Sequence, residues 1–135
     1  MVNPYKQYKQ QAVLTLSPGE LVVKLLDRCI TDLEQAKAIL DEKNDKMYLS
    51  YHTITSHLHH AITILEYMIA SLDMQYEISD QLSSLYEFYI WKIKNANSEK
   101  NPKILAEIIP MISDIKTGFI GAEREVQKAK AKKAS

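Results

Sequence analysis

Apolar residues recur along most of this chain at alternating intervals of three and four positions, the spacing of one face of an α-helix. The first such stretch follows Ser17-Pro18-Gly19-Glu20, where a serine N-cap, a proline at the first helical position and a glutamate at the third form a capping box. It ends in the polar stretch 41–45. The pattern predicts a helix whose buried face consists of Val22, Leu26, Cys29, Leu33, Ala36 and Leu40.

The same spacing predicts three more helices downstream. The second covers about residues 46–70, and the third begins near residue 77 or 79. The polar stretch 95–102 ends the third helix and begins the fourth. The predicted buried faces are, in chain order, Tyr51, Ile54, Leu58, Ala61 or Ile62, Leu65 and Met68 or Ile69; then Ile78, Leu82, Leu85, Tyr89, Ile93 and Ala96, widened by Tyr86 and Ile90; then Leu105, Ile108, Ile112, Ile115, Phe119 and Ala122.

The fourth helix carries two irregularities. Pro110 lies inside its apolar pattern, and an interior proline removes a backbone hydrogen bond and clashes with the preceding turn. We therefore predict a kink, or a short segment over about 103–109 followed by a longer helix. The lysine-rich end has no apolar face and is predicted to fray.

The predicted fold is all-α. No stretch of the chain alternates apolar and polar residues with a period of two, so no strand is expected. Short connections favour antiparallel neighbours, which gives an up-down-up-down four-helix bundle with a short N-terminal arm. The expected organisation is an arm over residues 1–16, the bundle over 17–127 and a frayed, lysine-rich tail over 128–135.

Charge and hydropathy narrow the range of partners. The 135 residues include 17 Lys+Arg and 17 Asp+Glu, for a formal net charge of +0. This balance argues against a nucleic-acid partner or an anionic membrane surface as the main target. No apolar run is long enough to span a membrane, and the N-terminus has no signal-peptide-like stretch. We therefore expect a cytoplasmic protein without membrane insertion.

The residues that could carry chemistry are few. Of the four histidines, only His57 and His60 have the spacing of two metal ligands on one helix, and no Glu-x-x-His motif accompanies them. Cys29 lies on the predicted core face, so we interpret it as a buried thiol and not as a nucleophile. Phosphate-binding loops, nucleophile elbows and paired carboxylate motifs are absent from the sequence. We expect no enzymatic activity, no catalytic residue, no metal site and no cofactor.

Tyrosine is the unusual feature of the composition, with 8 Tyr against 2 Phe. Tyrosine combines apolar area with a polar tip and is enriched where proteins bind partners. The tyrosines either complete the core or border a groove that takes an amphipathic partner segment. Trp91 similarly is either a core or groove aromatic or an exposed stacking platform. The residues alone leave these alternatives open.

Three groups of residues, in this order along the chain, carry a family resemblance. They are Asn3-Pro4-Tyr5-x-x-Tyr8 with Val13 and Ser17-Pro18-Gly19-Glu20-Leu21; Ser71-Leu72-Asp73-Met74 with Ile78, Leu82, Leu85-Tyr86-Glu87-Phe88, Ile93 and Ala96-Asn97; and Leu105-Ala106-Glu107 with Phe119 and Ala122. Over about residues 3–122 the chain resembles the FliS family of flagellin-export chaperones. It departs from the family pattern at Asp27, Gly118 and Phe119, where the family usually has Tyr, Ala and Trp.

The resemblance implies a cytoplasmic, non-enzymatic chaperone. Such a protein binds the disordered C-terminal segment of flagellin, prevents its premature polymerisation and assists its delivery to the flagellar type III secretion apparatus. The family's N-terminal arm packs over part of the binding surface and moves when flagellin arrives. Contacts with export-gate components and a weak homodimer stay open, and the alternative function is a metal-binding or self-associating structural bundle.

The candidate partner-binding residues come from two sources. The arm candidates rest on the family motif, and they are Tyr5, Tyr8 and Val13. The groove candidates rest on the apolar width of the second and third helices, and they are Ile54, Leu58, Tyr86, Tyr89, Ile90 and Ile93.

Overall fold

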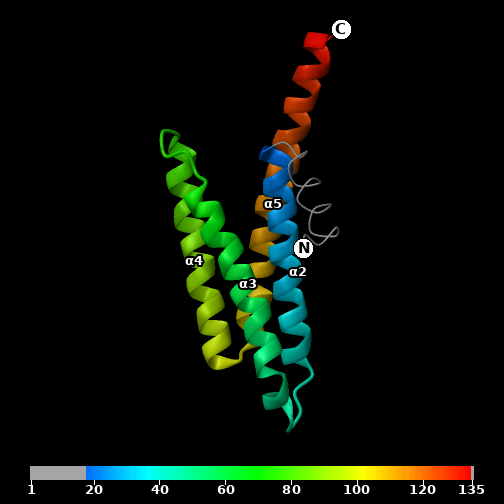
Figure 1. Ribbon diagram of the computed structural model, residues 1–135, viewed down its shortest axis with the longest axis vertical. Coiled ribbons are helices and arrows are strands. Elements are labelled where there is room, and N and C mark those ends of the chain that lie inside the picture. Colours follow the sequence, from blue (N-terminus) through cyan, green and yellow to red (C-terminus); the bar gives the residue numbers. More distant parts are fainter. Residues whose placement is uncertain (1–17, 135) are drawn as a thin grey trace, which may run out of the picture.

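A computed structural model describes residues 18–134, which form four long α-helices and a short 3-10 helix, with no strand in that range (Figure 1). Successive long helices run in opposite directions, so the predicted all-α, up-down-up-down bundle is confirmed. The expected arm, 1–16, and the N-cap Ser17 lie outside the described residues. The elements are α2 (Pro18–Asp41), η1 (Met47–Ser50), α3 (Tyr51–Ala70), α4 (Glu77–Glu99) and α5 (Pro102–Ala134).

The predicted face of α2 packs into the core almost as expected. Leu26, Cys29 and Leu33 are fully buried, and so are Ala36 and Leu40 further along the same face. A leucine buried in this way contributes about 2 kcal/mol relative to an exposed one. The three-and-four spacing therefore identified the residues that hold α2 against α3 and α5.

Helix α4 buries Tyr86, Tyr89, Ile93 and Ala96 as its pattern predicted, but the predicted face is not buried along its whole length. Ile78 and Leu85, expected in the core, are 61% and 41% exposed. Ser79 is buried in place of Ile78, and it lies seven residues before Tyr86 on the same side of the helix. Apolar residues cover more of this helix than its neighbours can, so one apolar strip of α4 is left at the surface.

The turn between α3 and α4 fixes where that strip begins. The Ser71 hydroxyl donates to the Met68 carbonyl (3.0 Å), which closes the end of α3. Asp73 Oδ1 accepts the Gln75 N–H (3.0 Å), and the Ser79 hydroxyl donates to the Asp73 carbonyl (2.6 Å). These side-chain bonds set the direction in which α4 leaves the turn.

A short turn joins α4 to α5 at the opposite end of the molecule. Lys100 adopts a left-handed conformation (φ 51°), and the N–H of Asn101 donates to the Ala96 carbonyl (3.0 Å), which caps α4. Asn101 Oδ1 accepts the Lys103 N–H (3.0 Å), and Pro102 occupies the first position of α5. The two helices meet here and diverge in Figure 1 toward the far end of the bundle.

Helix α5 continues through Pro110 without a break, so the predicted short first segment is not observed. The proline leaves the Ala106 carbonyl without its usual helical donor. Both residues are exposed, so water can reach this carbonyl. Leu105, Ile108 and Ile112 are fully buried on either side of the proline and hold both halves of the helix against the core.

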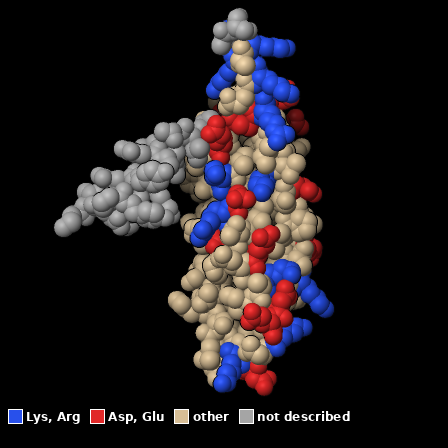
Figure 2. All heavy atoms as spheres, turned by 90° about the vertical axis from the view of Figure 1, so that its right-hand side faces the viewer, with Lys and Arg blue, Asp and Glu red and all other residues tan. Residues whose placement is uncertain are grey.

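The lysine-rich end is helical to Ala134, whereas the sequence pattern predicted fraying from residue 128. Alanine and lysine are good helix formers, and Lys132 and Lys133 lie in the last turn, where positive charge complements the helix dipole. This part of α5 projects beyond the other helices (Figure 1), and Figure 2 shows basic side chains around it. The division of the chain at residue 127 stays a prediction, which α5 crosses without interruption.

Candidate partner-binding groove between α4 and α5

An apolar groove of about 300 Å³ lies between the N-terminal half of α4 and the middle of α5. None of the described residues that line it carries a charged or titratable side chain. Its walls consist of Ile78 and Leu82 from α4 and of Ile115, Gly118, Phe119 and Ala122 from α5.

Small residues on α5 keep the groove open. A Cβ atom added to Gly118 would meet nothing within 4 Å. Leu82, Ile115 and Phe119 are half-buried and pack against the core, so they form a firm apolar floor. A concave apolar surface of this kind, already formed without a partner, fits apolar side chains from another molecule.

The exposed apolar strip of α4 continues beyond the groove. Leu85 lies seven residues after Ile78 and therefore on the same face, followed by Phe88 and Trp91. The rings of Phe88 and Trp91 lie 6.5 Å apart, and Lys92 Nζ is 5.7 and 5.9 Å from their centres. Trp91 is 57% exposed, so the interpretation as a core aromatic is wrong.

The groove candidates from the sequence lie elsewhere, in the core. Ile54, Leu58 and Ile93 are fully buried, Tyr86 and Tyr89 are 1% and 2% exposed, and Ile90 is half-buried against the core. In the closed bundle a partner reaches the five buried side chains only if helices separate. Their role in binding stays a prediction, and the arm candidates Tyr5, Tyr8 and Val13 lie outside the described residues.

Sequence reasoning missed the groove because it assigned its lining to the core. Ile78, Leu82, Ile115, Phe119 and Ala122 all have core spacing in their helices. The available signal was the glycine pair of α5, Gly118 and Gly121, beside the unusually wide apolar face of α4. Helical glycines weaken a helix by about 1 kcal/mol each. Two of them in α5 therefore indicated a position on its surface where a larger side chain would be in the way.

Tyr86 carries a buried hydroxyl that has no hydrogen-bond partner among the described residues. Burial, followed by the charge of Tyr89, raises the pKa of Tyr86 to about 12. An unpaired buried hydroxyl destabilises the fold by about 1–3 kcal/mol. Tyr86 therefore fills space in the core at some cost in stability.

Tyr86→Phe should stabilise the bundle by about 1 kcal/mol, because it removes the unpaired hydroxyl and keeps the ring. Thermal unfolding measures this as a rise in Tm. Tyr89→Phe is the matched control, since Tyr89 is 2% exposed on the same face but its hydroxyl is not among the buried unpaired groups. A lower Tm for Tyr86→Phe would mean that its hydroxyl has a stabilising partner.

The candidate metal and thiol chemistry gains no support. Among residues 18–134, no set of three His, Cys, Asp or Glu side chains is arranged to hold a metal ion. Cys29 is fully buried, with Sγ 3.9 Å from the Ala61 carbonyl oxygen. Burial, and then the charge of Asp32, raise the pKa of Cys29 to about 12, which keeps the thiol protonated and unreactive. The interpretation of Cys29 as a core residue is confirmed.

No helix within the described range has the length and hydropathy needed to cross a bilayer.

Comparison with known proteins relates the chain to one protein family. The family model described as "Flagellar protein FliS" matches residues 1–126, which include all of α2, α3 and α4 and most of α5. The chain is also 25% identical over 117 residues to the flagellar secretion chaperone FliS of Bacillus subtilis (strain 168), which covers 87% of this chain and 84% of that protein. The chain therefore belongs to the FliS family of flagellar secretion chaperones.

Proposed function

We propose that this protein binds the C-terminal segment of flagellin in the cytoplasm, prevents its premature polymerisation and assists its delivery to the flagellar type III secretion apparatus. Family membership supports a chaperone role in flagellar secretion. The observation that carries the flagellin proposal is the open apolar groove between α4 and α5.

The groove suits a segment that becomes helical as it binds. An amphipathic helix presents apolar side chains every three or four residues, and a groove between two helices of a bundle accepts such a row. Leu82 and Phe119 supply the floor and Ile78 one rim. A disordered segment loses conformational entropy when it orders, so it needs a large apolar contact, which the strip through Leu85 and Phe88 extends.

The proposed role is binding without catalysis. The groove is lined by aliphatic and aromatic side chains and a glycine, none of which can transfer a proton or attack a substrate. The strongest pKa shifts belong to Cys29 and Tyr86, and both side chains are buried in the core. Among the described residues, none that lines the groove offers general acid, general base or nucleophilic chemistry.

Further contacts are proposed for the N-terminal arm, for buried side chains of α4 and for surfaces outside the groove. Tyr5, Tyr8 and Val13 act as an internal competitor that leaves the binding surface when flagellin arrives, as the family resemblance implies. Contacts with Tyr89 or Ile93 require α4 to move away from the core. Components of the export gate are further proposed partners, which use surfaces outside the groove.

A polymerisation assay tests the chaperone function. Purified flagellin of the same organism is induced to polymerise, and light scattering is followed with and without an equimolar amount of this protein. We expect polymerisation to be suppressed while flagellin stays soluble in a one-to-one complex. Unchanged polymerisation in the presence of the folded bundle would contradict the proposal.

A further inference from the structure

The basic and acidic residues of this chain are unevenly divided along it. Residues 126–135 contain four lysines and no acidic residue, so all 17 Asp+Glu lie before them. The rest of the chain therefore has four fewer basic than acidic residues, and the zero net charge of the whole chain conceals two regions of opposite sign. We call residues 126–134, the last part of α5, the basic end.

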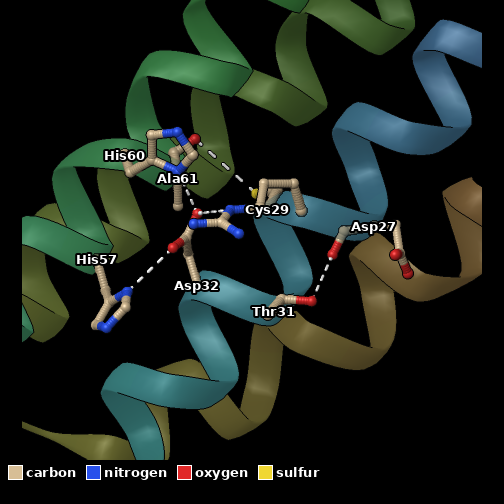
Figure 3. Close-up of polar contacts among 8 residues, drawn as sticks. Asp27, Cys29, Thr31, Asp32, His57, His60 and Ala61 are labelled. Carbon is tan, nitrogen blue, oxygen red and sulfur yellow. Dashed lines mark hydrogen bonds and ion pairs between the residues drawn. The ribbon is translucent and has the colours of Figure 1, made fainter. Parts of the chain in front are cut away.

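The acidic residues before the basic end lie almost entirely at the surface. Asp32 is the one buried carboxylate among the described residues, and Figure 3 shows two imidazoles of α3 turned toward it. His57 Nδ1 lies 3.0 Å from Asp32 Oδ1, and His60 Nδ1 is hydrogen-bonded to Asp32 Oδ2. Every other carboxylate of the described range is at least partly exposed. An anionic partner is therefore attracted to the basic end and repelled by the rest of the surface.

The basic end presents its charge away from the acidic bundle. Its four lysines are all exposed, and they lie on the part of α5 that projects beyond the other helices (Figures 1 and 2). Lys128 Nζ lies 3.7 Å from Glu125 Oε1, but both side chains are highly exposed, so this ion pair is weak. From residue 126 to 134 the helix rises about 12 Å, whereas charges are screened over about 8 Å at physiological ionic strength.

The arrangement of the lysines favours a fluid anionic surface. Lys128 and Lys132 are one turn apart on the same side of α5, whereas Lys130 lies on the opposite side. A rigid acidic protein surface matches one face of a helix. The head groups of a bilayer move laterally, so they can gather around long, flexible side chains that leave the helix in different directions.

The composition of the basic end argues against two other kinds of contact. It has no aromatic side chain on which the bases of a single-stranded nucleic acid could stack. Val126 is its one large apolar residue, so it has no apolar face that could enter the hydrocarbon of a bilayer. Any membrane contact therefore stays at the level of the head groups.

We propose that the basic end of α5 binds the surface of an anionic phospholipid bilayer through its lysines, independently of the α4–α5 groove. The match to the FliS family model ends at residue 126, so this surface lies outside the matched part of the chain. Each lysine held near an anionic surface strengthens binding by about fivefold. The contact is therefore weak, reversible and sensitive to salt.

Co-sedimentation of the full chain with lipid vesicles tests this proposal. One set of vesicles contains phosphatidylglycerol in phosphatidylcholine, and the other contains phosphatidylcholine alone. We expect the wild type to bind the anionic vesicles only, and high salt to release it. Replacing all four lysines of the basic end with glutamine, a good helix former, should lower the partition coefficient by at least about tenfold.

The matched control replaces four other exposed lysines with glutamine, namely Lys43, Lys46, Lys94 and Lys103. It has the same net charge as the first variant, and it should bind the anionic vesicles within about 2-fold of the wild type. Arginine at the four positions of the basic end should keep the binding, because the proposal depends on charge. Thermal unfolding verifies that all three variants are folded.

Three results would overturn the proposal. The first is no binding of the wild type to anionic vesicles, or equal binding to both kinds, which would leave an acidic protein surface as the partner to test. The second is an equal loss in the control, which would show an effect of net charge alone. The third is tighter binding of the wild type to a labelled oligonucleotide than to the anionic vesicles, which would assign the basic end to nucleic acid.

Discussion

Replacing Phe119 with glutamate should weaken binding of the flagellin C-terminal segment by about 100-fold or more. The ring of Phe119 forms part of the groove floor and is half-buried against the core. Truncating an aromatic anchor at the centre of an interface costs about 2–4 kcal/mol, and a carboxylate covered by an apolar partner adds a desolvation penalty. Fluorescence anisotropy with a labelled flagellin peptide measures the loss.

Thr117→Glu is the matched control for this prediction. It introduces the same charge on the same helix, at an exposed position that does not line the groove. The control should bind the peptide within about 2-fold of the wild type, because surface charges contribute little at a distance. Equal loss of binding in both variants would point to a general charge effect, and unchanged binding in Phe119→Glu would remove the groove from the flagellin site.

Gly118→Leu should strengthen the bundle and weaken the complex. In the folded protein, the added side chain enters open space, since a Cβ at this position meets nothing within 4 Å. Replacing a helical glycine with leucine stabilises the helix by about 0.8 kcal/mol, which thermal unfolding records as a higher Tm. The same side chain fills the groove that Gly118 lines, so peptide binding should fall by about 10-fold or more.

Gly121→Leu separates these two effects. Gly121 is also exposed, a Cβ there also meets nothing within 4 Å, and it is not part of the groove wall. Both leucine variants should therefore raise the Tm by similar amounts, whereas only Gly118→Leu should lose peptide binding. Full binding by Gly118→Leu would mean that the partner does not occupy the groove.

The sequence was most informative where a helix has one apolar face and clear ends. In α2, Pro18 and Gly19 at the start, a polar stretch at the end and a single apolar row from Leu26 to Leu40 left one possible orientation, and the structure has it. In α4, apolar residues stand on adjacent faces, so periodicity alone could not decide whether Ile78 or Ser79 turns inward. That choice depends on the packing of α4 against α3 and α5, which local spacing does not contain.

The continuity of α5 and the contact between Asp32 and His57 could not be predicted from the sequence for related reasons. Local chemistry at Pro110 predicted a kink or a short first segment, but buried side chains before and after it, such as Ile108 and Ile112, keep α5 continuous. Asp32 and His57 are 25 positions apart, and nothing in the sequence around either residue indicates that they meet. Long-range polar contacts of this kind follow from the arrangement of the helices and not from a motif.

Titration calorimetry at several temperatures tests most directly whether a flagellin segment folds into the α4–α5 groove. The ligand is a peptide of about 50 residues from the C-terminus of the flagellin of the same organism, long enough for coupled folding and binding. We expect one-to-one binding with a large negative heat-capacity change for the wild type and for Gly121→Leu, and much weaker binding for Gly118→Leu. Absence of binding to the folded wild type, or equally tight binding to Gly118→Leu, would contradict the proposed site.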